Sequence, residues 1–221
     1  MKFIEYPDAE MMMIDLADTL ASELKNALLG NETVSFAVPG GTTPGPIFDV
    51  LCGAAHIDWS RVHVLLTDER RVPETHERSN TRLIKQRLLV DAAAAANYVS
   101  IVPDGDGDLA ALSDSLAPHL PISVMLLGMG ADMHTASIFP NSPDLDAALT
   151  TDLSLAAVQP PDGLEARITL SAKVLKGALN RHIVITGREK RAAFERAQYL
   201  DPHSAPIAAV VAGSTVHWAE N

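Results

Sequence analysis

The stretch Ile122-Ser-Val-Met-Leu-Leu127, which runs into Gly128, decides the fold class. It is a short, almost wholly apolar run without polar and apolar alternation, which is typical of a strand buried on both faces of a parallel sheet. Comparable runs occur at residues 34–38, 61–66, 98–102 and 182–186, with further strand candidates at 167–170 and, as an edge strand, 216–218. We expect these runs to share one sheet.

Helical patterns separate these strands. Between residues 9 and 29, apolar side chains recur every four positions, which predicts an amphipathic helix that ends at Gly30. Shorter helices are expected at 47–51, 80–89, 109–117 and 189–198. Alternating strands and helices predict βαβ crossovers, and therefore a single α/β domain over residues 1–221 whose largely parallel, Rossmann-like sheet has helices on both faces.

Composition and charge exclude several classes of protein. Of 221 residues, 47% are apolar and 20% charged, as in an ordinary globular protein. A net charge of −11 disfavours nucleic acid and anionic membranes as partners. No apolar run reaches membrane-spanning length, and the first residues lack a secretory pattern. A single cysteine, Cys52, allows no internal disulfide, so we expect a cytoplasmic protein.

The charge is unevenly distributed along the chain. Residues 70–87 contain six Lys and Arg against two Glu, a net charge of +4, which leaves −15 for the rest. A basic segment in an acidic protein suits a small anionic ligand, although a solvated helix face would have the same composition.

Three motifs follow the expected strands at their carboxyl ends, where open α/β sheets bind ligands. The first is Gly40-Gly41-Thr42-Thr43-Pro44, in which glycines allow close approach of a ligand and the hydroxyls and the following helix supply hydrogen-bond donors. It lacks the third glycine of a dinucleotide fingerprint and the Lys of a Walker loop. It indicates an anion site or an ordinary glycine turn.

The second motif is Thr67-Asp68-Glu69-Arg70-Arg71-Val72-Pro73. Arginine presents a planar fork that matches phosphate, and a neighbouring carboxylate can hold that fork or orient a histidine. The alternative is an exposed loop with internal ion pairs.

The third motif begins at Gly128 and continues through Gly130, Asp132 and His134 to Pro140. We expect Asp132 to cap a helix whose first turn contains His134, where the helix dipole would favour a neutral imidazole that can accept a proton. A structural histidine is the alternative. Arg167 and Lys190 add cations beside a strand end and a helix start, which fits anion contact or solvent-facing ion pairs.

Taken in this order and at these separations, the motifs resemble those of the 6-phosphogluconolactonase family, from residue 40 through Lys190 and more loosely to Trp218. Asp68-Glu69-Arg70 followed by Val72-Pro73, and His134-Thr-Ala-Ser-Ile-Phe-Pro140, are its most specific elements. A glucosamine-6-phosphate deaminase would be expected to have Phe-Asn-Glu-Pro at 137–140 and tyrosine at position 70.

The resemblance implies hydrolysis of 6-phospho-D-glucono-1,5-lactone in the oxidative pentose phosphate pathway, by a monomer or small homo-oligomer without a cofactor or metal. It implies His134 as the base that activates water, with Asp68 and Glu69 positioning the histidine or the sugar hydroxyls. It also implies substrate or phosphate contacts from Gly40, Gly41, Thr42, Thr43, Arg70, Arg71, Gly130, Asp132, Arg167 and Lys190.

One residue departs from the family pattern. Met133 stands where the family often has glycine, and methionine would be strained there if the backbone requires a positive φ. Two other functions remain as alternatives: a sugar-phosphate isomerase or deaminase on the same scaffold, and a sugar-phosphate sensor without catalysis.

Overall fold

A parallel sheet forms the centre of the computed structural model, which describes residues 1–103 and 107–221. Within these residues the main sheet has seven strands in the order β1-β10-β9-β6-β2-β3-β5, and every neighbouring pair is parallel. A smaller antiparallel sheet has the order β4-β8-β7.

The strands are β1 (Lys2–Tyr6), β2 (Val34–Val38), β3 (Val62–Leu66), β4 (Asp68–Arg70), β5 (Asn97–Val99), β6 (Val124–Gly128), β7 (Leu155–Val158), β8 (Arg167–Leu170), β9 (Asn180–Thr186) and β10 (Thr215–Ala219). The α-helices are α1 (Ala9–Gly30), α2 (Gly45–Leu51), α3 (Asn80–Arg87), α4 (Leu109–Ser115), α5 (Leu145–Thr150), α6 (Ala172–Gly177) and α7 (Arg188–Ala197). Short 3₁₀ turns lie at Trp59–Arg61, Asp91–Ala95, Ala117–His119 and Pro206–Ala209.

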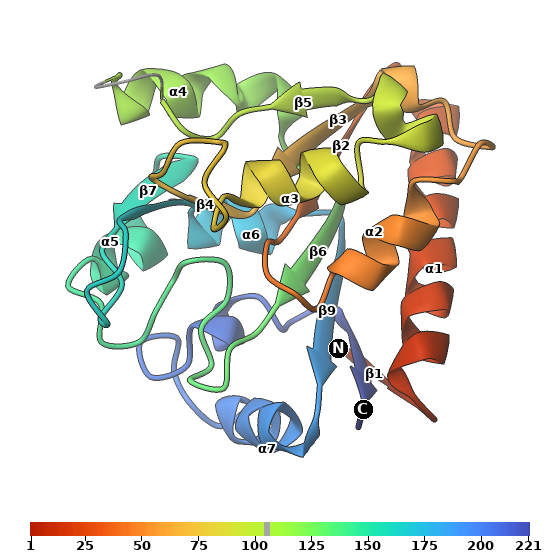
Figure 1. The fold of residues 1–221 in the computed structure, drawn as a ribbon. Helices are drawn as coiled ribbons and strands as arrows, with labels where there is room; N and C mark the ends of the chain where they lie inside the picture. The colour runs from red at the N-terminus through yellow and green to blue at the C-terminus, as the bar shows by residue number, and fades with distance from the viewer. Residues whose placement is uncertain (104–106) are drawn as a thin grey trace.

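Helices cover both faces of the main sheet. Helix α1 starts at Asp8, whose side chain accepts a hydrogen bond from the Met11 N–H at 2.8 Å, and its apolar stripe is buried. In Figure 1, α1 and α2 lie on the right of the sheet, whereas α5, α6 and the small sheet lie on the left. Among the described residues, no helix is long and apolar enough to span a membrane.

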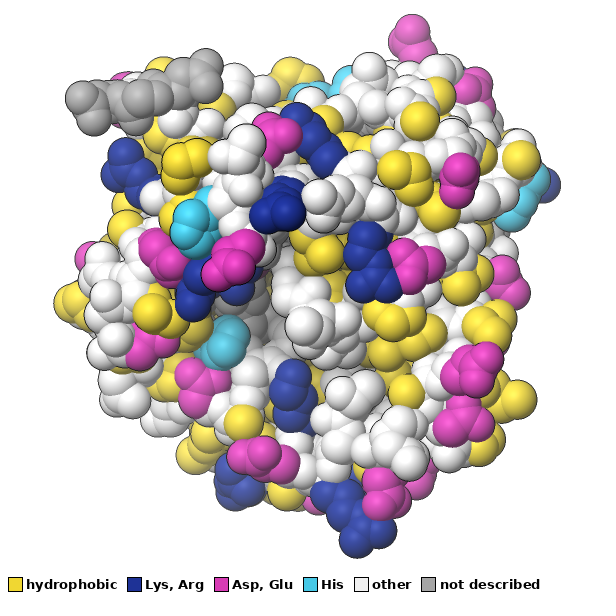
Figure 2. Space-filling model, in the orientation of Figure 1, with side chains coloured by type: hydrophobic (Ala, Val, Ile, Leu, Met, Phe, Trp, Pro, Cys, Tyr) yellow, Lys and Arg dark blue, Asp and Glu magenta, His cyan; other side chains and the backbone are white. Residues whose placement is uncertain are grey.

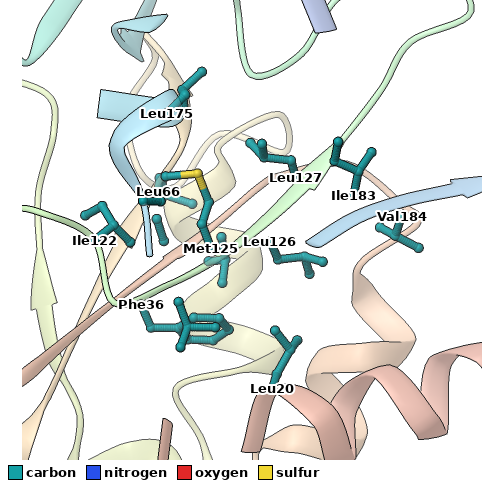
Figure 3. Packing of buried hydrophobic residues seen from close by; sticks show 14 of the residues in the cluster. Leu20, Phe36, Leu66, Ile122, Met125, Leu126, Leu127, Leu175, Ile183 and Val184 are labelled. Carbon is teal, nitrogen blue, oxygen red and sulfur yellow. The ribbon is translucent and has the colours of Figure 1, made fainter. Parts of the chain in front are cut away.

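The core is built on the central strands. Phe36 of β2 and residues 124–127 of β6 are buried, and Leu20 of α1 packs beneath them on one face (Figure 3). Leu175 of α6 is also fully buried and lies on the opposite side of β6 in the same view. Because strand side chains alternate between faces, continuous apolar runs are what a sheet covered on both sides requires.

The sheet order fixes where a ligand can bind. From β2 the chain proceeds outward to β3 and β5, and then returns to place β6 on the other side of β2. The loops after β2 and β6 therefore diverge from adjacent strands, which opens a crevice at the carboxyl edge of the sheet. The first and third motifs are these two loops.

The structure corrects several expectations. Residues 215–219 do form a strand, but it lies inside the sheet, because the unexpected strand β1 pairs with its outer side. Residues 167–170 form a strand of the small antiparallel sheet rather than of the main sheet. The expected strand at 98–102 is limited to Asn97–Val99, and the sequence patterns did not predict β4, β7, α5 or α6.

Candidate active site

A polar cavity of about 260 Å³ opens at the crevice between β2 and β6. Figure 2 shows the surface hollowed near its centre, with basic side chains around the hollow. Most of the expected site residues line this cavity: Gly40, Gly41, Thr42, Thr43, Asp68, Arg70, Gly130, His134, Arg167 and Lys190. Glu69, Arg71 and Asp132 are not among the lining residues.

The alternation of strand β4 explains which charged residues reach the cavity. The four charges of the second motif were expected in a loop, but Asp68–Arg70 pairs with β8 as an antiparallel strand. Successive side chains of a strand point to opposite faces. Asp68 and Arg70 therefore line the cavity, whereas Glu69 and Arg71 point away from it.

Glu69 supports the site from outside. Its side chain is buried, and its carboxylate accepts hydrogen bonds from the backbone N–H groups of Asn80 and Thr81 at 2.9 and 2.6 Å. The Ser79 and Thr81 hydroxyls donate to the same carboxylate at 3.1 and 2.8 Å. Glu69 thus fixes the start of α3, and it neither bonds to His134 nor lines the cavity.

Arg71 also lies outside the cavity. Its side chain is exposed, and its backbone N–H donates to the Ala166 carbonyl, which continues the pairing of the small sheet. Arg70, and not Arg71, is therefore the arginine of this motif that lines the cavity.

A buried ion pair lies at the base of the cavity. The Asp68 carboxylate accepts a hydrogen bond from the Ser137 hydroxyl at 2.6 Å, and the Arg167 guanidinium lies 3.8 Å from the same oxygen. Asp68, Ser137 and Arg167 are all buried. Burial lowers the pKa of Arg167, which the charge of Asp68 opposes. The role of Ser137 in holding Asp68 was not predicted, because residues 68 and 137 meet only in the fold.

The glycine loop is shaped for close approach. Gly41 has φ +88°, a conformation that favours glycine, and a Cβ on Gly40 would overlap the Asn80 side chain. Within the described residues, the backbone N–H groups of residues 40–43 make no hydrogen bond to another backbone group. They are free to donate to an anion in the cavity.

His134 reaches the cavity from a loop and not from a helix. The expected helix after Asp132 is absent: the chain makes turns and a single bridge between Thr135 and Ile138. The N–H of Met133 donates to the Gly130 carbonyl, and the N–H of Gly130 to the His134 carbonyl, so the segment closes on itself. The helix dipole therefore has no influence on this imidazole.

A carboxylate takes the place of the dipole. The Asp132 Oδ1 lies 2.5 Å from the His134 Nδ1 and accepts the His134 backbone N–H at 3.2 Å. Burial alone would raise the pKa of the Asp132 carboxyl, but the bonds from His134 outweigh it and lower that pKa. Because a carboxylate only accepts, Nδ1 carries a proton, and in the neutral ring the lone pair is therefore on Nε2.

Two residues on the His134 loop have an unusual backbone. Met133 has φ +69° and Ala136 has φ +48°. The condition under which methionine would be strained is therefore met at position 133, at a cost of roughly 1–2 kcal/mol. Gly130 cannot carry a side chain, because a Cβ there would overlap the His134 ring.

The cavity is positively charged in a negatively charged protein. Among the described lining residues, Arg70, Arg167 and Lys190 face a single carboxylate, that of Asp68. Burial lowers the pKa of Lys190, although the charges of Glu189 and Asp132 act in the opposite direction. No cluster of three or more His, Cys, Asp or Glu side chains that could hold a metal is present in the described part of the chain.

An open parallel sheet with a cationic cavity at its switch point, and a carboxylate-held histidine inside that cavity, defines an α/β protein that acts on a small anion. Residues 7–218 match the model of the family described as Glucosamine-6-phosphate isomerases/6-phosphogluconolactonase. The chain belongs to this family.

Individual relatives agree with this result. The chain is 38% identical over 212 residues to a 6-phosphogluconolactonase of Mesorhizobium japonicum, covering 93% of this chain and 88% of the relative. It is 36% identical to a 6-phosphogluconolactonase of Pseudomonas aeruginosa, covering 92% and 88%. A crystal structure of a 6-phosphogluconolactonase from Shewanella baltica superposes with a TM-score of 0.93 at 32% identity, covering 99% and 97%.

Proposed function

We propose that this protein hydrolyses 6-phospho-D-glucono-1,5-lactone to 6-phosphogluconate. The relatives named above support the lactonase reaction. The observation that carries the proposal in this chain is the His134–Asp132 pair, which opens onto a cavity lined by three cations.

His134 is the general base in this proposal. With Nδ1–H held by Asp132, Nε2 accepts a proton from a water molecule as that water attacks the lactone carbonyl. The same nitrogen then returns the proton to the ring oxygen as the carbon–oxygen bond breaks. Asp132 keeps the ring in one orientation and stabilises the transient imidazolium.

The remaining lining groups bind the anionic parts of the substrate. We assign Arg70, Arg167, Lys190 and the free N–H groups of residues 40–43 to the phosphate and to the carbonyl oxygen that gains negative charge. Asp68 is held by Ser137 and Arg167, so its remaining acceptor capacity suits a sugar hydroxyl.

The substrate also suggests a cellular setting. A phosphorylated aldonolactone is an intermediate of the oxidative pentose phosphate pathway, and we place the protein in that pathway and in the cytoplasm. We propose that residues 1–221 act as one catalytic domain, because the cavity draws its lining from residues 39 to 190.

The direct test is hydrolysis of freshly generated 6-phosphogluconolactone by the purified protein, followed as acid release with the spontaneous rate subtracted. Glucosamine 6-phosphate is supplied in parallel and ammonia is measured. We expect acid release only. Ammonia release would support the deaminase alternative, and binding of 6-phosphogluconate without turnover of either compound would support a sensor.

A further inference from the structure

The Asn80 side chain contacts both the glycine loop and strand β4, which line the cavity. Its side chain is 2% exposed, and both ends of its amide are used. The Nδ2 donates to the Asp68 carbonyl at 2.8 Å, and the Oδ1 accepts from the Arg70 Nη1 at 2.6 Å. The same side chain lies against the Gly40 α-carbon.

The guanidinium of Arg70 is fixed only partly by the protein. Its Nη1 donates to Asn80 and to the Arg78 carbonyl at 2.7 Å, whereas its Nε is buried and has no partner among the described residues. A buried, unpaired N–H is unfavourable unless a ligand or water accepts from it. The Nη2 of Arg70 likewise makes no hydrogen bond to a described residue, and because Arg70 lines the cavity, Nη2 is the donor left for an anion that occupies it.

We propose that Asn80 is a positioning residue that aims Arg70 at the bound anion. The proposal rests on the proposed function, because it assigns the anion to the substrate phosphate or lactone oxygens. Asn80 is itself held from outside the cavity: Glu69 accepts its backbone N–H at 2.9 Å. Glu69 of the second motif therefore acts on the site indirectly, because it holds Asn80 at the start of α3.

A double-mutant cycle tests this proposal. Asn80→Ala should raise KM about tenfold with little change in kcat, and should add nothing further in an Arg70→Ala background, because residues that act through one another are not additive. The matched control is Thr81→Ala, which removes a buried hydroxyl bonded to Glu69 at 2.8 Å without contacting Arg70. Thr81→Ala should leave KM unchanged.

Two measurements keep the outcome clear. Asn80→Asp retains the acceptor that faces Arg70 and should preserve more affinity than Asn80→Ala, even if both lower the melting temperature. Effects of Asn80→Ala and Arg70→Ala that multiply in full would overturn the positioning role. Absence of wild-type turnover would instead overturn the proposed function, and the cycle would then be read from the affinity for 6-phosphogluconate.

A second, independent observation is a buried hydrogen-bonded chain that the reaction does not use. It runs from Asp15 to Tyr6 at 2.6 Å, from Tyr6 to His217 at 3.0 Å, from His217 to His182 at 3.0 Å, and from His182 to Glu23 at 2.8 Å. It ties β1, β10 and β9 to two positions on α1.

With both carboxylates ionised and both imidazoles neutral, this hydrogen-bonded chain would lack one proton. Four hydrogen bonds need four protons, but one phenol and two neutral imidazoles between two ionised carboxylates supply three. We infer that the folded chain binds one extra proton. Burial and the bond to Asp15 raise the pKa of Tyr6, so the phenol keeps its proton. Burial first, and then the charge of His182, lower the pKa of His217 to about 4, so the bond left without a proton is the one between His182 and Glu23. The charge of Asp15 raises the pKa of His217 and that of Lys2 lowers it.

Glu23→Gln provides the test, because its amide can donate the missing proton to His182 and satisfy all four bonds without an ionised ring. We expect the wild type at pH 7 to carry the extra proton, as a doubly protonated His182 ring or a protonated Glu23 carboxyl, and Glu23→Gln to show two neutral rings in its imidazole ¹⁵N shifts. In the control, Asp18→Asn, an exposed carboxylate of the same helix is neutralised, and the wild-type pattern of imidazole ¹⁵N shifts should remain. Two neutral rings together with an ionised Glu23 carboxylate in the wild type at pH 7, read from the imidazole ¹⁵N and carboxyl ¹³C shifts, would overturn the inference.

Discussion

Replacing His134 by asparagine is the most direct probe of the proposed mechanism. Asparagine keeps a polar side chain of similar reach but cannot accept the proton from water. A positioned general base contributes roughly a hundred- to ten-thousandfold to the rate. At about 1.36 kcal/mol per tenfold, the expected loss is about 2.7–5.4 kcal/mol of transition-state stabilisation.

The structural cost of this change is smaller than the catalytic loss. The His134 side chain is 31% exposed, and its ring centroid lies 4.6 Å from that of Phe139. Loss of such an aromatic pair costs about 0.5–1.5 kcal/mol. The variant should therefore remain folded.

The assay compares turnover per folded molecule in wild type and His134→Asn, with the spontaneous opening of the lactone subtracted. Affinity for 6-phosphogluconate, measured by calorimetry, should change little, because the ring is not among the groups assigned to the phosphate. A folded variant with near-normal kcat would refute His134 as the base and leave the sensor as the better interpretation.

Three further outcomes concern the cations and the strained loop. Arg167→Ala should raise KM by about 1.5–3 kcal/mol, the worth of a hydrogen bond to a charged group, with phosphorylated lactone preferred in the wild type; equal turnover of gluconolactone would contradict the assignment. Because burial lowers the pKa of Lys190, this side chain should lose its charge, and substrate binding should weaken, at a lower pH than with an ordinary lysine. Lys190→Arg should therefore move the rise of KM to higher pH. A KM profile that does not move would exclude Lys190 as a phosphate ligand. Met133→Gly should keep kcat within about tenfold and stabilise the fold by up to about 1 kcal/mol, read from thermal unfolding, because φ is +69° there; a lower melting temperature would show that the methionine side chain contributes more than its strained backbone costs.

The fold class could be predicted from the sequence because the buried strands are continuous apolar runs. Strands β2 and β8 occupy the expected residues, and α1 ends at Gly30 as expected. A strand buried on both faces needs continuous apolar residues, so β2 and β6 could be recognised without any partner. The edge strand β1 could not, because Lys2 and Glu5 give it no such run and its pairing with β10 joins residues about 200 positions apart.

The site was readable at the level of motifs but not of side-chain direction. The run Asp68-Glu69-Arg70-Arg71 has four charges, and only its strand conformation separates those that face the cavity from those that do not. That conformation depends on pairing with β8, which is distant in sequence. Asn80 and Ser137 had no independent signal, because their partners are brought to them by the fold.

His134 lines the cavity although the local structure expected around it was wrong. Aspartate followed two residues later by histidine suggested a capped helix, but Met133 takes a positive φ and the chain turns back, so the first helical turn never forms. The turn brings the Asp132 carboxylate to the Nδ1 of the imidazole, where a helix would have directed backbone N–H groups at the solvent. A helix N-terminus keeps an imidazole neutral by opposing its positive charge, whereas a carboxylate favours that charge once the proton arrives. The loop therefore suits a base that must accept a proton and hold it briefly, and the strain at Met133 is the local cost of placing Asp132 beside His134.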